Sequence, residues 1–250
     1  MSGHSKWSQI KRQKGVNDAR RGAVFTKVAR DIAIAARAGG GDPDGNFKLR
    51  LAIEKARGVN MPADNIKRAI ERGAGGGEAE QFEEITYEGY GPGGVAILVE
   101  AATDNRNRTA ADVRAVFTKH GGQLAGSGAV AWQFEQRGLI AVPLGGQDAD
   151  DLALLAIDAG AEDVDTDADP LEVFTGPTEL EAVRRALEAA GVRIESAELI
   201  MQATNTIEVD EAKARANLRL IEHLEDHEDV QRVTGNFEIP DEVMAEAATT

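Results

Sequence analysis

The chain has 250 residues, with 28 Lys or Arg against 43 Asp or Glu and a formal net charge of −15 at pH 7. It contains no cysteine, which excludes disulfides and thiolate chemistry. Its apolar runs are far shorter than the roughly 18 residues that span a bilayer. We therefore expect a protein of the cytoplasm or an organelle matrix, with no membrane partner and enough chain to bury a core.

The negative average hides a strong asymmetry along the chain. Residues 1–75 hold 16 basic and 7 acidic residues, a net charge of +9, whereas residues 76–250 hold 12 and 36, a net charge of −24. Such asymmetry indicates a part that binds a polyanion, joined to an acidic, solubilising part. The alternative is that the basic helices simply have solvated faces.

The first fifteen residues are basic and polar and carry a single aromatic residue, Trp7. They lack the apolar segment of a signal peptide and have too few apolar residues to form a core element. Contact with nucleic acid explains this composition, because the cations can meet phosphates and the indole ring can stack on a base. The candidate contacts in this arm are His4, Lys6, Trp7, Lys11, Arg12 and Lys14.

Apolar residues at helical spacing predict three helices, over residues 16–38, 43–57 and 62–72. Asp42-Pro43 is typical of an N-cap followed by proline at the first helical position. Gly73 is expected to end the third helix and to open a glycine-rich linker, residues 73–77. The outward cations of the first and third helices extend the basic arm into one predicted nucleic-acid-binding surface: Arg20, Lys27, Arg30, Arg37, Lys67, Arg68 and Arg72.

After the linker the apolar period changes to two, which predicts strands over residues 82–89 and 95–103. The glycine-rich joint between them matches the letters G-x-G-x-x-G, but a strand and not a helix follows it, so we reject a dinucleotide site. The next loop, residues 104–109, contains Asn105, Arg106 and Arg108. These three residues serve either as turn formers and helix caps or as a clamp for phosphates or a base edge. A helix to about residue 120 follows.

Further strands are predicted over residues 129–136, 139–143, 163–167, 171–175, 193–201 and 230–236, with helices over 150–159, 178–190 and 210–226. From residue 139 to 201 the order is β-α-β-β-α-β, which is the ferredoxin-like pattern. The last helix and strand complete a second set that begins at residue 95.

We therefore predict an α+β multidomain protein, with an N-terminal three-helix bundle followed by two ferredoxin-like α+β domains, one inserted in the other. The expected limits are 1–77 for the basic helical domain, 78–137 plus 202–240 for the outer domain, 138–201 for the acidic insert and 241–250 for a tail.

No constellation for catalysis stands out. His223 and His227 are spaced to share a helix face, but His-Leu-Glu-Asp-His lacks the third ligand and the base of a zincin motif. No serine sits in a nucleophile elbow. Residues 138–201 hold 15 acidic and 3 basic residues and one aromatic, Phe174, which excludes an RRM-type RNA surface there. We predict no enzyme, metal, cofactor or small-molecule substrate.

Several motifs resemble the YebC/PmpR family along nearly the whole chain: GHSKW (3–7), the cluster at 11–14, FTK (25–27), GGGDP (39–43), NMP (60–62), YEGYGPGG (87–94) and DNRNRT (104–109). Gln13 departs from the basic or His residue expected there. The resemblance implies a helical bundle with two α+β domains and, for bacterial members, a cytoplasmic DNA-binding transcriptional regulator. Similarity to a mitochondrial translational activator implies the alternative, a ribosome-associated factor that binds rRNA or tRNA and relieves stalling at sites such as consecutive prolines.

Overall fold

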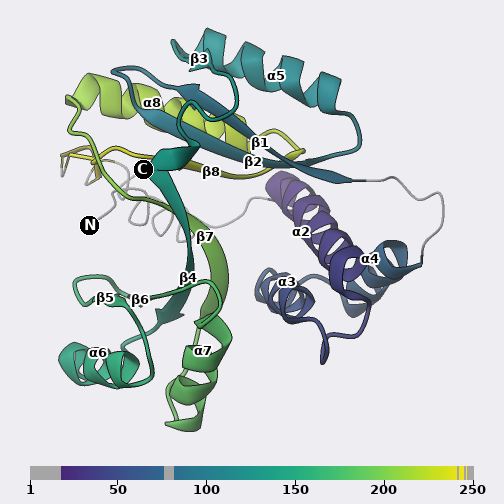
Figure 1. The fold of residues 1–250 in the computed structure, drawn as a ribbon, viewed down its shortest axis with the longest axis vertical. Helices are drawn as coiled ribbons and strands as arrows, with labels where there is room; N and C mark the ends of the chain where they lie inside the picture. Colours follow the sequence, from purple (N-terminus) through teal and green to yellow (C-terminus); the bar gives the residue numbers. More distant parts are fainter. Residues whose placement is uncertain (1–17, 76–81, 241, 245, 247–250) are drawn as a thin grey trace. The chain divides into compact units, whose positions relative to one another are not determined.

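The computed structural model describes residues 18–75, 82–240, 242–244 and 246. Helices and two four-stranded sheets give the α+β multidomain architecture that the sequence predicts (Figure 1). The chain divides into two compact units, Glu135–Gln202 and a larger one formed by Ser2–Phe134 with Ala203–Thr250. No helix in the described part of the chain is long and apolar enough to cross a membrane.

Three helices form the predicted N-terminal bundle: α2 (Asp18–Gly39), α3 (Phe47–Gly58) and α4 (Ala63–Ala74). Their apolar stripes, which recur at helical spacing, meet in one core. The buried members of this core include Val28, Ile32, Ala36, Leu49, Ile53, Met61 and Ile66.

Helix α3 begins at Phe47 and not at residue 43, so the prediction of an Asp42 cap is wrong. Asn46 is the N-cap, and its side-chain oxygen accepts a hydrogen bond from the Leu49 N–H at 3.1 Å. Its amide nitrogen donates to the carbonyl of Ala35 at 2.7 Å and to that of Gly40 at 2.8 Å. This buried side chain therefore ties the end of α2 to the start of α3, a role that local sequence rules do not reveal.

Gly73 does not end α4, which continues to Ala74. A Cβ at residue 73 would lie 2.2 Å from the carbonyl oxygen of Ala33. The glycine is thus needed for the close approach of α4 to α2, not for a helix stop. This close contact brings the two helices together beneath the site described below.

The larger unit contains a sheet with the order β3-β1-β2-β8 and antiparallel pairing throughout. Its strands are β1 (Glu83–Tyr90), β2 (Ala96–Thr103), β3 (Gln123–Leu124) and β8 (Val230–Gly235). β1 and β2 pair without a break from Glu83 opposite Thr103 to Tyr90 opposite Ala96. Helices α5 (Arg106–Lys119) and α8 (Glu211–Glu225) lie on one face of this sheet (Figure 1).

This sheet has the spatial layout of a ferredoxin-like fold with one difference in connectivity. β2, α5, α8 and β8 match four members of the predicted β-α-β…α-β set. Its second strand is β3, and not the predicted strand over residues 129–136. In a ferredoxin-like fold, the strand that pairs with the first strand lies between the two helices in the sequence. Here β1, which precedes β2 in the chain, occupies that position beside β2. The β1–β2 hairpin supplies that strand locally, so the chain can leave after β3 and form the other unit before α8.

The predicted strand over residues 129–136 is wrong in its first half. Residues Ala131–Gln133 form a short 3-10 helix, and β4 runs unbroken from Phe134 to Val142. The carboxylate of Glu88, a buried residue, accepts hydrogen bonds from the N–H groups of Gly128, Val130 and Ala131 at 2.6–2.7 Å. With its N–H groups bound to one carboxylate, this segment cannot join a strand ladder.

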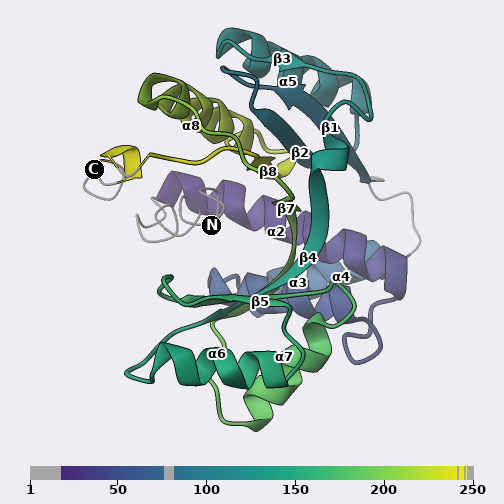
Figure 2. The ribbon, with the colours of Figure 1, turned by 60° about the vertical axis from the view of Figure 1, so that its left-hand side comes forward.

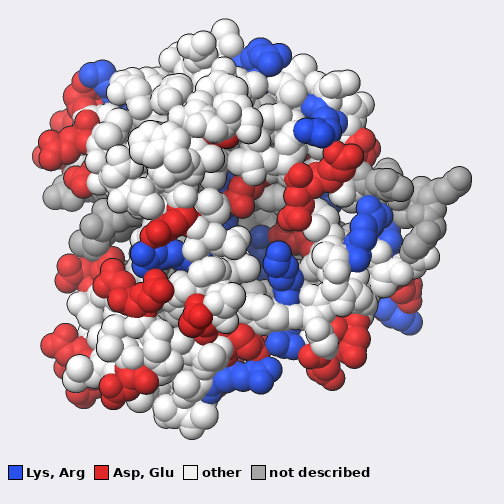
Figure 3. Space-filling model, in the orientation of Figure 1, with Lys and Arg blue, Asp and Glu red and all other residues white. Residues whose placement is uncertain are grey.

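The smaller unit has the order β5-β6-β4-β7, which is the ferredoxin-like order that the sequence predicts. Its further elements are α6 (Ala149–Asp158), β5 (Asp163–Asp165), β6 (Leu171–Thr175), α7 (Leu180–Ala189) and β7 (Ser196–Ala203). Both helices lie on one face of the sheet (Figure 2). Acidic side chains gather on the surface over α6, including Asp150, Asp151 and Asp158 (Figure 3).

The chain enters and leaves the smaller unit at neighbouring points. The N–H of Thr204 donates to the carbonyl of Gln133 at 2.8 Å, and the Thr204 hydroxyl donates to the same oxygen at 3.0 Å. Both residues belong to the larger unit. The two crossings of the chain are therefore fixed side by side.

Candidate nucleic-acid interface

Two of the predicted contact residues on α2 are engaged inside the larger unit. Lys27 donates to the carbonyl of Glu225, the last residue of α8. Arg30 Nη1 donates to the carbonyl of Glu228 at 2.6 Å and to the carboxylate of Asp229 at 2.8 Å. These partners fit a cation well, because the carbonyls at the C-terminal end of a helix carry negative partial charge. This part of the cationic face of α2 thus packs against residues 225–229.

Asp229 is the centre of the contact. Its side chain is fully buried, and it accepts hydrogen bonds from Thr109 at 2.7 Å, Arg30 at 2.8 Å, Arg108 at 3.0 Å and Thr103 at 3.2 Å. Burial alone would raise the pKa of this carboxyl group, but the hydrogen bonds from Thr109 and Arg108 and the positive charges outweigh it. The pKa of Asp229 therefore lies below its ordinary value.

The loop of residues 104–109 combines a cap with ion pairs. Asn105 is the N-cap of α5 and accepts from the Arg108 N–H at 3.2 Å, which is the structural one of the two roles considered for it. Arg108 also pairs with Asp104 at 2.7 Å. Arg106 lies 3.8 Å from Glu83 and remains largely exposed. Of the three predicted contacts in this loop, Arg106 is the side chain that makes the weakest interaction with the rest of the protein.

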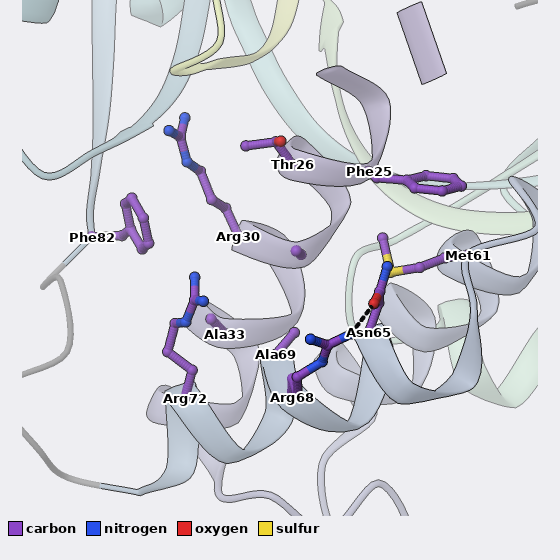
Figure 4. Close-up of a pocket in the computed structure, with 11 residues that line it drawn as sticks. Phe25, Thr26, Arg30, Ala33, Met61, Asn65, Arg68, Ala69, Arg72 and Phe82 are labelled. Atoms are coloured by element: carbon purple, nitrogen blue, oxygen red, sulfur yellow. Dashed lines mark hydrogen bonds between the residues drawn. The ribbon is translucent and has the colours of Figure 1, made fainter. Parts of the chain in front are cut away.

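Other predicted contacts gather around a cleft on the bundle, between α2, α4 and Phe82, which precedes β1 (Figure 4). Phe82 begins the sheet domain, a name used for the β3-β1-β2-β8 sheet with α5 and α8. The cleft has a volume of about 350 Å³. Among the described residues its lining contains three arginines and two phenylalanines and no carboxylate: Phe25, Thr26, Ala29, Arg30, Ala33, Met61, Asn65, Arg68, Ala69, Arg72 and Phe82. We call this set of residues the arginine cleft.

The arginine cleft exists because small residues line its floor while long residues stand at its rim. Ala33 and Ala69 are buried where α2 and α4 meet, next to the close approach at Gly73. Figure 4 shows Phe82, Arg30 and Arg72 on one side of these alanines, with Phe25, Met61, Asn65 and Arg68 on the other. Each side of the cleft therefore presents a ring and at least one guanidinium group.

The three guanidinium groups differ in how they are held. The guanidinium carbon of Arg30 lies 4.9 Å from the centre of the Phe82 ring. Arg68 donates to the side chain of Asn65 at 2.6 Å and to the carbonyl of Asp64 at 3.2 Å. Arg72 has no carboxylate partner among the residues that the structure describes. A cleft lined by charges of one sign attracts a ligand of the opposite charge.

The remaining predicted contacts lie apart from the cleft or outside the described residues. Arg37 is exposed near the end of α2, and Lys67 is exposed on α4, 3.8 Å from Glu71. Arg20 belongs to α2, but its side chain is not among those described. Six predicted contacts lie outside the described residues: His4, Lys6, Trp7, Lys11, Arg12 and Lys14.

Sequence reasoning missed three residues that line the arginine cleft, Phe25, Asn65 and Phe82. Residue 82 is predicted only as the start of a strand and residue 25 only as part of a helix, although a phenylalanine beside basic residues can indicate a ring in a binding cleft. Asn65 carries no local pattern. Trp132 does not line the cleft; it is 71% exposed and lies on the segment that Glu88 binds. Burial by itself raises the pKa of Glu88, but the N–H donors of Val130, Gly128 and Ala131 outweigh it, and the pKa is lowered.

Within the described ranges no group of three or more His, Cys, Asp or Glu residues could hold a metal ion. The histidine pair considered from the sequence has ordinary partners. His223 Nδ1 lies 2.8 Å from the carbonyl of Arg219, and His227 Nε2 lies 3.3 Å from Asp112.

Comparisons with known proteins agree along the chain. The family model described as "TACO1/YebC protein N-terminal domain" matches residues 5–76, and the one described as "TACO1/YebC second and third domain" matches residues 82–237. A protein of Rubrobacter xylanophilus is 56% identical over 249 residues, which cover 99% of this chain and all of that protein. A protein of Chloroflexus aurantiacus is 59% identical over 248 residues, 98% of each chain.

Both of these relatives carry the name "Probable transcriptional regulatory protein". Among solved structures, a conserved hypothetical protein from Aquifex aeolicus, Aq1575, superposes with a TM-score of 0.84 at 49% sequence identity. The match covers 89% of this chain and 92% of that one.

Proposed function

The chain belongs to the TACO1/YebC family, and we propose that it is a nucleic-acid-binding regulator of gene expression whose helical bundle holds the phosphate backbone. The observation that carries this proposal is the arginine cleft, which Arg30, Arg68 and Arg72 all line, and whose described lining residues include no carboxylate. Guanidinium groups bind phosphate through paired N–H donors. The net charge of +9 over residues 1–75 supports the same ligand class.

The first candidate is a DNA-binding transcriptional regulator, in line with the printed name of the relatives. Its contacts would be mainly to phosphates, so they would position the protein on the duplex and carry little sequence information. Arg37, Lys67, Arg68 and Arg72 are the exposed cations of α2 and α4 that can supply them.

The test measures the affinity of the full chain for a duplex of random sequence over a range of salt concentrations. The variant Arg68→Gln/Arg72→Gln is expected to weaken binding and to reduce the slope of log K against log salt by about 2. The control is Lys48→Gln/Arg57→Gln, which removes two exposed cations from α3, outside the cleft. Equal effects of the two double variants would assign binding to overall charge and reject the cleft as the interface.

The second candidate is a ribosome-associated translation factor that binds rRNA or tRNA. It is favoured by the contacts of α2, because Lys27 and Arg30 bind residues 225–229 and that part of the helix is not free to lie in a major groove. Co-sedimentation with ribosomal fractions, compared with chromosomal DNA at the same salt, separates the candidates. A salt-sensitive shift with ribosomes alone supports the second candidate.

We further propose that the protein acts by binding and not by catalysis, without a cofactor or small-molecule substrate. The relatives are named as regulatory proteins, which supports this proposal. The limits 1–77, 78–137 plus 202–240, and 138–201 are proposed as its domains. The two family models, which end at residue 76 and begin at residue 82, support the first limit.

A further inference from the structure

We propose that the arginine cleft receives an unpaired base of a single-stranded nucleic acid. This inference rests on the proposed function and deepens it, because it names the form of the nucleic acid and the place where a base is held. A surface for phosphates alone needs only exposed cations. The cleft adds a hollow, two aromatic rings and polar groups with unused hydrogen-bonding capacity, and each of these argues for a base.

The size and floor of the cleft suit one flat ring system. Ligand pockets for small molecules begin at about 300 Å³, and the cleft measures about 350 Å³. Its floor of small side chains, including Ala29, Ala33 and Ala69, leaves this space open between two helices. A base inside a duplex is stacked and paired, so it cannot enter such a hollow unless it is flipped out. An unpaired base can enter directly.

The aromatic rings give the hollow two stacking surfaces. Phe25 and Phe82 are both half-buried, one on each side of the alanine floor. Arg30 already lies over the Phe82 ring, so a guanidinium plane and a ring are adjacent there. Bases stack on aromatic rings and on guanidinium planes in proteins that bind single strands. Phosphate binding would not require either ring.

The polar groups of the cleft have capacity left for a base edge. The Asn65 side-chain oxygen accepts from Arg68, which leaves its amide N–H groups to donate. The Thr26 hydroxyl donates to the carbonyl of Gly22 at 3.0 Å and keeps its acceptor lone pairs. Arg30 Nε is buried with no hydrogen-bond partner in the described part of the chain. A buried donor without a partner is rare, and a bound ligand would satisfy it.

Arg72 completes the arrangement as the phosphate contact. It stands at the rim beside Arg30 and has no described carboxylate partner. A nucleotide whose base lies in the hollow would bring its phosphate to the rim. Arg68 stands on the other side and can meet the next phosphate along the strand. The cleft would therefore bind a short stretch of single strand and not a free nucleotide.

The experiment uses the full chain and four labelled probes of equal length: a single-stranded RNA, the single-stranded DNA of the same sequence, the corresponding DNA duplex and a poly-glutamate peptide. We expect the single strands to bind more tightly than the duplex. Phe82→Leu, which keeps an apolar side chain, should weaken single-strand binding about tenfold and leave duplex binding within twofold. Phe25→Leu is the second variant.

The matched control is Phe47→Leu, because Phe47 is also a half-buried phenylalanine of the bundle beside an arginine, but it lies outside the cleft. It should leave both affinities unchanged. Urea unfolding of each variant identifies losses due to folding. If Phe82→Leu and Phe47→Leu act alike in folded protein, or if the peptide or the duplex binds as tightly as the single strands, the inference is overturned.

Failure of the inference and failure of the proposed function give different results. Binding to no nucleic acid rejects both, whereas binding that does not respond to Phe82→Leu rejects only the base site. Crosslinking with 4-thiouridine RNA provides an independent readout, with adducts expected on peptides that contain Phe82 or residues 61–72. Adducts confined to other peptides would also overturn it. Equal affinity for RNA and DNA means that the base alone is recognised, and a preference for RNA supports the translation candidate.

Discussion

Arg30 on α2 and Asp229 before β8 lie 199 positions apart in the chain and form an ion pair at 2.8 Å. The arginine side chain is 11% exposed and the aspartate is fully buried. Arg30 also lines the arginine cleft. Arg30 therefore joins the helical bundle to residues 225–229, as Lys27 does, and it also lines the cleft that is proposed to receive a base.

The first prediction concerns this pair. Asp229→Asn keeps the shape of the side chain but removes the charge that Arg30 and Arg108 share. Breaking a buried pair costs about 3–5 kcal/mol when a charge is left alone. Because Arg108 keeps Asp104 and Arg30 keeps the Glu228 carbonyl, we expect a loss of about 2–4 kcal/mol. Urea unfolding measures it.

The control for that experiment is Asp226→Asn. Asp226 is exposed at the C-terminal end of α8, where a negative charge is unfavourable. Its substitution should leave the free energy of unfolding unchanged or raise it slightly. A loss as large as that of Asp229→Asn would show that any charge change in this loop is destabilising.

The second prediction is a pH dependence of stability. The pKa of Asp229 is lowered in the folded protein, so the folded state holds its proton less tightly than the unfolded chain. The stabilisation is therefore fully present above the unfolded value, about 3.9, and is lost as the pH falls toward the folded pKa. Unfolding measured from pH 6 to pH 3 should show a steeper decline for the native chain than for Asp229→Asn. Parallel curves would contradict the prediction.

The third prediction concerns the close approach of α2 and α4. Gly73→Ala places a Cβ 2.2 Å from the carbonyl oxygen of Ala33, so the helices must move apart. Overpacking of this kind costs about 1–3 kcal/mol or more, and the widened floor should also weaken single-strand binding. Gly22→Ala is the control, since a Cβ there meets nothing within 4 Å. It should stabilise α2 by up to about 1 kcal/mol.

The fourth prediction concerns the segment held by Glu88. Glu88→Gln replaces a carboxylate that accepts three backbone hydrogen bonds with an amide that accepts fewer. We expect a loss of about 1–3 kcal/mol and greater mobility of Trp132. Fluorescence anisotropy of Trp132 in a Trp7→Phe background measures the mobility. Glu84→Gln, on the exposed part of the same strand, should leave the anisotropy unchanged.

Much of the fold could be predicted from the sequence, because periodicity reports which face of an element is buried. The bundle and the ferredoxin-like order of the smaller unit follow from such local patterns. The segment 129–133, the Asn46 cap and the role of Gly73 could not be predicted. Each depends on a partner distant in the sequence or on backbone proximity, as with Glu88 and the N–H group of Val130.

The positive charge of the candidate site could be predicted from the sequence, but its geometry could not. The cationic surplus identified Arg68 and Arg72, which line the arginine cleft. The same criterion could not separate them from Lys27, whose partner Glu225 lies 198 positions away. The role of Phe82 could not be predicted for a related reason: its ring lines the cleft only because the chain before β1 folds against Arg30 of α2.

The hydrogen bonds between Thr204 and Gln133 make the smaller unit removable in principle. Because these two residues are hydrogen-bonded, a tight turn could replace the residues between them without distorting the larger unit. The β3-β1-β2-β8 sheet takes all its strands from residues before 125 and after 229. The inserted unit can therefore gain, lose or change surface features in evolution while the cleft-bearing frame stays the same.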